Sequence, residues 1–87
     1  MNLKDTYNTI AEEWDRQHQS DDWWVAGTDK FVSFLKPGNF VLDVGCGVGT
    51  KSKYLSEKGL RVVGIDFAEK FVEIAREKVP ETKFLVV

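Results

Sequence analysis

Hydrophobic residues near the start of the chain recur at helical spacing. The apolar stripe consists of Leu3, Tyr7, Ile10 and Trp14, which fall on one face of a helix. Asp5 or Thr6 is expected to cap the start of this helix, because short polar side chains accept hydrogen bonds from free backbone N–H groups there. The polar stretch of residues 17–22 is expected to end the helix.

A short apolar patch and a second predicted helix follow. The patch consists of Trp23, Trp24 and Val25. We expect it to form a loop whose tryptophans either line a substrate pocket or pack against the sheet. The second helix is predicted over residues 29–36, with Thr28 or Asp29 as its cap and Pro37-Gly38 after its end. Its buried face is predicted to consist of Phe31, Phe34 and Leu35.

The second half of the chain shows a different pattern, in which strands and helices alternate. Short apolar runs predict strands that are buried as in a parallel sheet, and amphipathic stretches between them predict helices. The predicted strands cover residues 40–44, 60–65 and 83–87, and the predicted helices cover residues 50–58 and 69–79. The last helix is predicted to bury Phe71, Val72, Ala75 and Val79. Gly59 and Pro80 suit the ends of these two helices.

This β-α-β-α-β order predicts an α/β fold, namely one half of a doubly wound parallel sheet. The connections have the length that right-handed parallel crossovers require. Since crossovers that run one way along a sheet place their helices on the same face, we expect the other face to be bare. The first strand is expected to be a free edge. Such a chain is expected to self-associate or to need a complementary half.

Composition narrows the class of protein further. The chain has 87 residues, of which 43% are hydrophobic and 30% are charged, which is typical of one small globular domain. Its net charge of −2 gives no basic surface for nucleic acid. No stretch approaches the roughly 20 apolar residues of a membrane helix, and the first residues lack a signal peptide's apolar segment. We therefore expect a soluble cytoplasmic protein with no membrane or nucleic-acid partner.

The chain has a single cysteine, Cys46, and a single histidine, His18, so we expect neither an intramolecular disulfide nor a metal site. Cys46 is interpreted as a small residue in a tight loop, with a reactive thiol as the alternative. His18 is interpreted as a solvated residue at a helix end, with a role as general base as the alternative.

The residues that carry chemistry lie in the segment VLDVGCGVGT, residues 41–50. Gly45, Gly47 and Gly49 occupy the turn between the first strand and the next helix, where glycine lets a ligand approach the backbone. The helix that follows offers free N–H groups and a positive dipole end. Asp66 ends the second strand, about 20 residues further on, where a carboxylate can accept hydrogen bonds from a ribose diol. The combination predicts nucleoside binding.

Two better-known phosphate motifs do not fit this turn. A dinucleotide fingerprint needs a third glycine, and the two possible positions hold Thr50 and Ser52. A P-loop needs glycine directly before Lys51-Ser52, and Thr50 stands there. An NAD-binding fragment of an oxidoreductase remains as an alternative, and so does a non-enzymatic module that binds a partner through the bare sheet face.

The segment VLDVGCGVG closely resembles motif I of the class I, Rossmann-like methyltransferases that depend on S-adenosylmethionine. Residues 62–78 resemble the segment that follows motif I in that family, and residues 7–15 resemble the aromatic N-terminal helix of its small-molecule members. The resemblance implies a partial Rossmann-like fold, with three parallel strands in the order 3-2-1 and an N-terminal helical extension. It also implies a single but incomplete domain, residues 1–87, made of a helical part (1–36) and a cofactor-binding half (37–87).

The resemblance also implies a function and a set of binding residues. The cofactor would be S-adenosyl-L-methionine, with S-adenosyl-L-homocysteine as product, and the acceptor of the methyl group would be a small molecule. The residues implied to bind the cofactor are Asp43, Gly45, Cys46, Gly47, Gly49, Asp66, Phe67, Tyr7 and Trp14. Asp43 would anchor the methionine amino group, with satisfaction by loop N–H groups as the alternative. Asp66 would hold the ribose hydroxyls, and Phe67 would lie against adenine, with a place in the core as its alternative. Tyr7 and Trp14 would cover the cofactor, unless they belong to the core. No catalytic base is assigned, and this chain alone is expected to be inactive.

Overall fold

The computed structural model describes residues 2–87 and contains four helices and one parallel sheet with the strand order β1-β2-β3. The helices are α1 (Leu3–His18), α2 (Val25–Val32), α3 (Thr50–Glu57) and α4 (Glu69–Lys78), and the strands are β1 (Phe40–Val44), β2 (Arg61–Asp66) and β3 (Lys83–Val86). The predicted fold class and strand order are thereby confirmed. All five elements of residues 37–87 begin and end within one residue of their predicted bounds.

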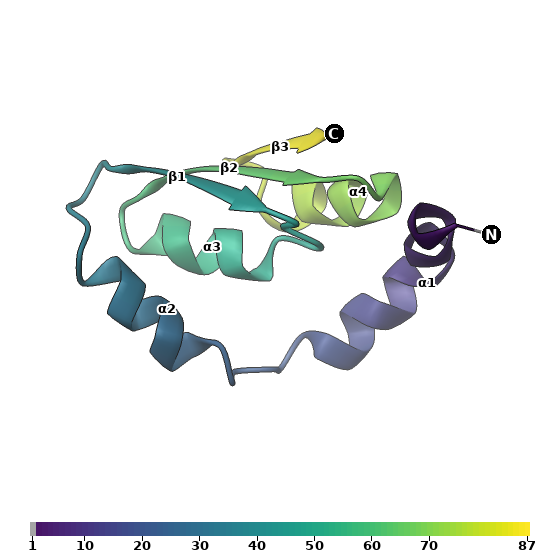
Figure 1. The fold of residues 1–87 in the computed structure, drawn as a ribbon, viewed down its shortest axis with the longest axis horizontal. Helices are drawn as coiled ribbons and strands as arrows, with labels where there is room; N and C mark the ends of the chain where they lie inside the picture. The colour runs from purple at the N-terminus through teal and green to yellow at the C-terminus, as the bar shows by residue number, and fades with distance from the viewer. Residues whose placement is uncertain (1) are drawn as a thin grey trace.

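The sheet places the carboxyl ends of β1 and β2 side by side. The strands pair in parallel, with Val44 opposite Ile65 and Ile65 opposite Leu85. Figure 1 shows α3 and α4 on one face of the sheet and α1 beyond the carboxyl ends of the strands, next to α4. Functional groups at the ends of two strands and on α1 can therefore meet at this edge.

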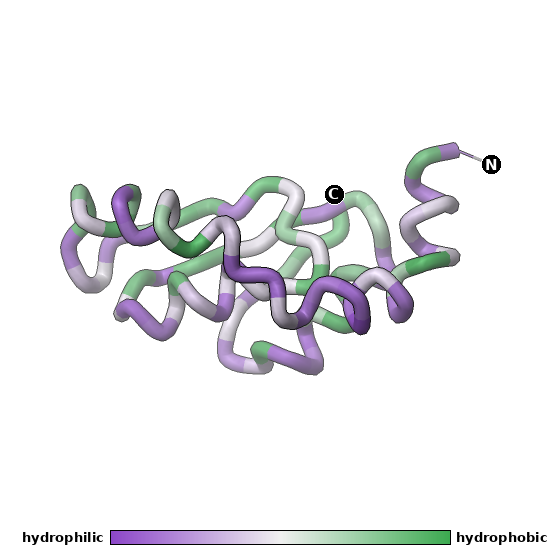
Figure 2. Tube along the Cα trace, turned by 90° about the horizontal axis from the view of Figure 1, so that it is seen from below, coloured by the Kyte–Doolittle hydropathy of each residue, from purple (hydrophilic) through white to green (hydrophobic). Residues whose placement is uncertain are grey.

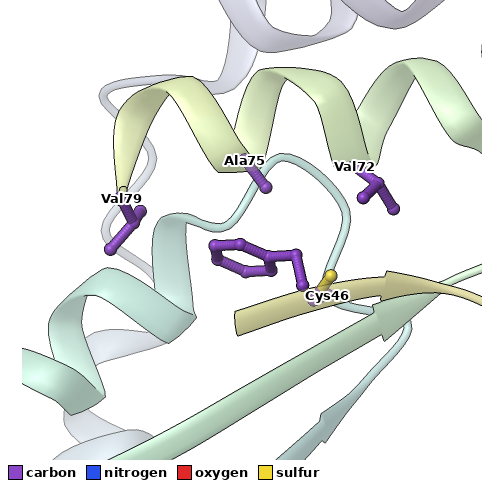
Figure 3. Close-up of a cluster of buried hydrophobic side chains, with 5 residues drawn as sticks. Cys46, Val72, Ala75 and Val79 are labelled. Atoms are coloured by element: carbon purple, nitrogen blue, oxygen red, sulfur yellow. The ribbon is translucent and has the colours of Figure 1, made fainter. Parts of the chain in front are cut away.

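The core lies between α4 and the sheet. Val72, Ala75 and Val79 project from α4 toward the strands, and Cys46 meets them from the loop after β1 (Figure 3). Phe84 of β3 fills the centre of this cluster and is 2% exposed. A Cβ atom on Gly64 of β2 would stand only 2.6 Å from the Phe84 ring. The ring can therefore occupy this place only because its neighbour on β2 has no side chain.

A second buried cluster joins α1 to the rest of the molecule. It consists of Ala11, Val48, Ala68 and Phe71, with Tyr7 packed against it. Polar contacts at the start of α4 support it: Asn8 Oδ1 accepts from the Lys70 backbone N–H at 2.9 Å, and Asn8 Nδ2 donates to Glu69 at 3.1 Å. Since Ala68 offers α4 no side-chain cap, Asn8 supplies that cap from another helix.

Two ion pairs add to the contact between α1 and α4. Lys4 Nζ lies 2.6 Å from Glu69, and Lys78 pairs with Asp15. The hydrogen bond to Lys4 lowers the pKa of the Glu69 carboxyl and raises the pKa of the Lys4 amine. On the exposed surface such pairs orient the helix more than they stabilise it.

The start of α1 differs from its prediction. The cap is Asn2, whose side chain accepts a hydrogen bond from the Asp5 N–H at 2.9 Å, and neither Asp5 nor Thr6 has that role. The buried residue of α1 is Ala11, whereas Leu3 is 60% exposed and Ile10 is 38% exposed. The small Ala11 side chain allows α1 to approach α4 closely, which turns part of the predicted stripe toward solvent.

The second helix also differs from its prediction. It begins at Val25 rather than Asp29, and its cap position, Trp24, makes no side-chain hydrogen bond to the helix. The helix ends at Val32, so Phe34 lies in the turn that follows and is 79% exposed. Phe31 is 49% exposed, and only Leu35 of the predicted buried face packs against a core cluster, together with Val32.

The face of the sheet opposite α3 and α4 is bare, as predicted. Four outward side chains carry this exposed apolar surface: Phe40 (62%), Leu42 (55%), Val44 (72%) and Leu85 (38%). Figure 2 shows that hydrophobic and hydrophilic positions alternate along the chain.

Among the described residues, no helix combines the length and the apolar character needed to cross a membrane.

Candidate functional site

A cleft of about 790 Å³ lies at the carboxyl ends of β1 and β2. It is lined by the end of β1 with the glycine loop and the first turn of α3, by the end of β2 with Phe71 of α4, and by α1 with the segment that follows it. Of the residues predicted to bind a cofactor, the cleft brings together Tyr7, Trp14, Asp43, Gly45, Cys46, Gly47, Asp66 and Phe67. Ligands of parallel α/β sheets bind at such an edge.

The glycine loop is held against β2 by its backbone. The N–H groups of Gly45 and Cys46 both donate to the Ile65 carbonyl, each at 2.9 Å. Gly47 follows with φ of 56°, in the left-handed region that favours glycine, and its N–H donates to the Asp66 carboxylate at 2.9 Å. The loop therefore passes across the end of β2 in one defined conformation, with its backbone along the cleft.

Gly49 is the one predicted site residue that does not line the cleft. It precedes α3 with φ of 86°, and a Cβ atom there would lie 3.0 Å from Ala75 and 3.1 Å from the Phe84 ring. The absence of a side chain at Gly49 thus allows α3 to start close to α4 and β3. This is a packing requirement at the helix start, away from the cleft surface.

The start of α3 leaves backbone donors available near the cleft. No side chain caps this helix, and Thr50 and Lys51 of its first turn line the cleft. The first N–H groups of a helix have no partner within it and carry a partial positive charge. A carboxylate or another anionic group of a ligand is favoured at this position.

Asp66 connects the glycine loop to the start of α4. One carboxylate oxygen accepts from the Gly47 N–H at 2.9 Å, and the other accepts from the Ala68 N–H at 3.0 Å. The side chain is 8% exposed and still lines the cleft. Because each carboxylate oxygen can accept more than one hydrogen bond, Asp66 keeps capacity for hydroxyl donors of a ligand.

Asp43 is held in place by a buried serine. Its Oδ2 accepts from Ser52 Oγ at 2.6 Å, and Ser52 is fully buried. Within residues 2–87 no other hydrogen bond or ion pair to Asp43 is found, so its second oxygen faces no protein donor. A half-buried carboxylate on the wall of a cleft is suited to receive a ligand ammonium.

Aromatic side chains form the wall of the cleft on the α1 side. The Tyr7 ring contacts Trp14 edge-on at a centroid distance of 6.3 Å, Phe67 at 5.9 Å and Phe71 at 5.4 Å. Phe71 is 5% exposed and belongs to the core, whereas Phe67 remains 38% exposed. The open ring of Phe67 next to Asp66 is a surface on which a flat ligand can stack.

His18 lines the cleft from the end of α1. Its ring stacks on Trp14 at a centroid distance of 3.8 Å, and Nδ1 lies 2.7 Å from the Trp14 carbonyl oxygen. Since a carbonyl only accepts, Nδ1 donates, and Nε2 of the neutral ring is the acceptor. His18 is therefore an ordered residue of the cleft, and its role as a base stays a prediction.

Cys46 is buried in the loop and packs in the core cluster (Figure 3). Burial, together with the nearby charges of Asp43 and Asp66, raises the pKa of the Cys46 thiol to about 12. The thiol is therefore protonated at neutral pH and is a poor nucleophile. This supports the interpretation of Cys46 as a small residue in a tight loop, and that loop lines the cleft.

Three cleft residues carry functional groups to which the sequence assigned no role, namely Asp21, Thr50 and Lys51, and so does the buried Ser52 behind Asp43. Ser52 could have been found, because it lies one helical turn before Leu55 on the buried face of α3, where a polar residue needs a partner. In residues 2–87 no group of three or more His, Cys, Asp or Glu side chains can hold a metal ion.

The chain was compared with known proteins. A family model described as a methyltransferase domain matches residues 41–87. Phosphoethanolamine N-methyltransferase 1 of Zea mays is 49% identical over 62 residues, which cover 68% of this chain and 12% of that protein. A ubiquinone biosynthesis O-methyltransferase of Coxiella burnetii is 34% identical over 71 residues, which cover 66% of this chain and 30% of that protein.

Solved structures give the same result for the fold. Magnesium protoporphyrin IX methyltransferase from Synechocystis PCC 6803, crystallised with bound SAM, is 28% identical and superposes with a TM-score of 0.77. The superposition covers 98% of this chain and 52% of that one. The chain spans 30%, 12% and 9% of the length of three curated relatives that it matches. The region that the family model matches, residues 41–87, includes the glycine loop, Asp43 and Asp66.

Proposed function

This chain belongs to the methyltransferase-domain family, the Rossmann-like proteins that depend on S-adenosylmethionine, and from this premise we propose that its cleft binds S-adenosyl-L-methionine. The protein of which this cleft is part transfers the methyl group to a small-molecule acceptor and releases S-adenosyl-L-homocysteine. Residues 37–87 are the cofactor-binding half of the domain, and residues 1–36 cover it.

One observation carries this proposal. The cleft joins two carboxylates, a glycine loop, an uncapped helix start and an exposed aromatic ring. These groups match the parts of the cofactor: an ammonium and a carboxylate at the methionine end, a ribose diol in the middle, and a flat purine. A cleft of about 790 Å³ is also large enough for a nucleoside with an amino-acid tail.

Each part of the cofactor has a place along the cleft. The free oxygen of Asp43 receives the methionine ammonium, and the first turn of α3 receives its carboxylate. Asp66, anchored by the Gly47 and Ala68 N–H groups, accepts from the ribose hydroxyls. Phe67 stacks against adenine, and Tyr7 and Trp14 close the cleft from α1. Gly49 contributes through the position of α3 alone.

When bound, the cofactor would supply a sulfonium methyl group for in-line transfer to the acceptor nucleophile, with S-adenosylhomocysteine as the leaving group. The residues of this chain hold donor and acceptor in the required orientation and exclude water, which accounts for a large part of catalysis in such reactions. Ser52 fixes the Asp43 rotamer and thereby the methionine end. The aromatic wall of Tyr7 and Trp14 keeps water from the reacting groups.

The bare sheet face bears on how the protein works as a whole. Phe40, Leu42 and Val44 expose an apolar surface beside the free edge of β1. We propose that further polypeptide covers this face in the active protein, supplied by the same chain type or by a complementary half. Sedimentation velocity at rising concentration separates the two: association is expected if the same chain type covers the face, and a monomer at all concentrations would contradict self-association and leave the complementary half.

Isothermal titration calorimetry with S-adenosylhomocysteine and with NAD tests the proposed cofactor. S-adenosylhomocysteine is expected to bind and NAD is not. Asp66→Ala is expected to weaken binding by at least about tenfold, because a charged acceptor of two ligand hydroxyls is lost. Glu57→Ala removes an exposed carboxylate outside the cleft and is the matched control, with affinity unchanged.

Two results of this titration would contradict the proposed cofactor or its site. Tighter binding of NAD than of S-adenosylhomocysteine would favour the oxidoreductase alternative. Equal affinities for the wild type and Asp66→Ala, with both proteins folded by amide NMR, would show that the cofactor does not use this cleft.

A further inference from the structure

A second cavity of about 370 Å³ adjoins the cleft on the side of α2. Its walls consist of Trp23, Trp24, Gly27, Thr28, Phe31, Asp43, Lys51 and Leu55. Trp23, Trp24, Asp43 and Lys51 also line the main cleft. A ligand in this second cavity, here called the tryptophan subsite, would therefore meet a ligand in the cleft.

The tryptophan subsite combines one fixed indole with exposed aromatic surface. Trp24 is fixed, because its Nε1 donates to the Asp21 carbonyl at 3.0 Å and its ring meets Tyr54 edge-on at 5.3 Å. Trp23 is 78% exposed and Phe31 is 49% exposed. Large aromatic side chains exposed on the walls of a cavity are a favourable surface for a flat apolar ligand.

Lys51 determines the charge of this subsite. Its Nζ lies 5.4 Å from the Trp23 ring centre and 6.0 Å from that of Trp24. Within residues 2–87, Lys51 forms no ion pair. Asp43, the carboxylate on the same wall, is bonded to Ser52 through one oxygen, and its other oxygen receives the methionine ammonium in the proposed function. The Lys51 ammonium lies over the indole faces that would otherwise attract a cationic ligand. Because it has no carboxylate partner in residues 2–87, it is available to pair with an anionic group of a ligand.

The position of the subsite relative to the two carboxylates indicates which end of the cofactor it faces. Asp43 lines both cavities, whereas Asp66 and Phe67 line only the cleft. If Asp43 receives the methionine ammonium, as in the proposed function, the subsite lies at the methionine end. The reactive methyl group belongs to that end of the cofactor, so a molecule held here is placed as an acceptor.

We propose that the tryptophan subsite binds the methyl acceptor, and that this acceptor is a flat apolar molecule with an anionic carboxylate or phosphate group. This assignment rests on the proposed function for its acceptor role. The flat part lies between Trp23, Trp24 and Phe31, and the anionic group pairs with Lys51. Because the Asp43 carboxylate is assigned to the methionine ammonium in the proposed function, Lys51 is the charge left for the acceptor, and an anionic group is favoured over an ammonium.

The test uses four small probes that share a phenyl group: benzoate, phenyl phosphate, benzyl alcohol and benzyltrimethylammonium. Each is titrated into the full chain, with and without S-adenosylhomocysteine, and binding is followed by tryptophan fluorescence and by indole N–H signals in NMR spectra. Both anions are expected to bind, the neutral probe more weakly, and the cation not at all. The ratio of the two anion affinities distinguishes a carboxylate from a phosphate acceptor.

Matched variants separate the subsite from the rest of the surface. Lys51→Gln is expected to weaken anion binding about tenfold, because a hydrogen bond between charged groups is lost. Lys58→Gln removes a cation over Tyr54 on the same helix but outside the subsite, and is expected to change nothing. Phe31→Ala is expected to weaken all bound probes, whereas Phe34→Ala, at a more exposed phenylalanine outside the subsite, is not.

Three results would overturn the proposal. The first is no binding of either anion at millimolar concentration, and the second is binding of the cation at least as tight as that of the anions. The third is a Lys51→Gln variant that loses affinity for S-adenosylhomocysteine but not for the anions, which would assign Lys51 to the cofactor carboxylate. Failure of S-adenosylhomocysteine to bind would instead contradict the proposed function, and the probe titrations without it would still decide the subsite.

Discussion

The two halves of the molecule are built in different ways. Residues 37–87 contain nearly all of the buried side chains, grouped between α3, α4 and the sheet. In the described part of residues 1–36, Ala11 is the one hydrophobic side chain in the buried core, although this part contains three tryptophans and two phenylalanines. Its aromatic side chains instead line the cleft and the tryptophan subsite.

The difference shows how this fold separates stability from recognition. The βαβαβ half hides its apolar surface and holds the glycine loop and both carboxylates in fixed positions. The α1 part of residues 1–36 is attached by one small cluster, the Asn8 cap and two ion pairs, and the α2 part by Val32, Leu35 and Trp24. Both parts leave rings accessible to a ligand. Changes to the buried side chains of residues 37–87 should therefore mainly alter folding, and changes to the exposed rings of residues 1–36 should mainly alter binding.

The largest effect is expected from Gly64→Ala in β2. The new Cβ would meet the buried Phe84 ring at 2.6 Å and Cys46 at 3.0 Å, so the core must shift. We expect a loss of about 2–3 kcal/mol in the free energy of unfolding, as is usual for an overpacked core. Urea denaturation followed by circular dichroism measures it.

Gly27→Ala is the matched control from the helical half. Nothing lies within 4 Å of a Cβ at this position in α2, and alanine favours helix. We expect a gain of up to about 1 kcal/mol. Similar losses for both variants would mean that the two halves do not differ in packing as described.

A smaller effect is expected where the two halves meet. Asn8→Ala removes the side-chain cap that residues 2–87 provide for α4 and is expected to cost about 1 kcal/mol of unfolding free energy. Asn2→Ala removes the cap of α1 instead, and should fray that helix without loosening α4. Amide hydrogen exchange at residues 69–72 tells them apart, and faster exchange there in Asn2→Ala than in Asn8→Ala would contradict this assignment.

The sequence predicted the βαβαβ half well because its signals are local. Strands β1 and β2 are short apolar runs, and α4 buries all four of the predicted side chains. The start of α2 was missed because Val25 has no polar cap before it, and a Trp24 cap position carries no sequence signal. The burial of Ala11 and the exposure of Phe31 depend on contacts between distant segments, which periodicity does not report.

Most of the candidate site was predictable for the same reason, but three of its features were not. The glycine loop and the acids at the strand ends follow one another closely in the chain, and the sheet brings them together. The Ser52 bond to Asp43 and the position of Lys51 over two indoles arise only when α3 and the segment after α1 are placed. Gly49 fits the glycine pattern but packs against Ala75.

Cys46 makes the stability of the βαβαβ half, residues 37–87, depend on pH. Its thiol pKa is raised to about 12 by burial and by the charges of Asp43 and Asp66, above the ordinary value of 9.0 that applies to the unfolded chain. The contribution of the protonated Cys46 thiol to the free energy of unfolding is therefore complete below pH 9, and it is lost as the pH rises from 9 toward 12. Native protein at pH 8 should react with iodoacetamide far more slowly than unfolded protein, and equal rates would show an accessible thiolate.

The smallest effect on stability is expected from Trp23→Ser in the helical half. Trp23 is 78% exposed, so its loss should change the free energy of unfolding by no more than about 0.5 kcal/mol. The same change should remove the fluorescence response to benzoate and phenyl phosphate. A variant that unfolds, or one that retains full probe binding, would contradict the division between a stabilising and a recognising half.

The central claim is that both halves together form one cofactor cleft. A two-dimensional amide NMR titration with S-adenosylhomocysteine tests it most directly. We predict shifts at residues 45–50 and at Asp66 and Phe67, together with shifts at Tyr7 and Trp14 on α1. A well-dispersed spectrum in which these signals stay in place, or in which only Leu42 and Leu85 on the bare sheet face respond, would contradict the account.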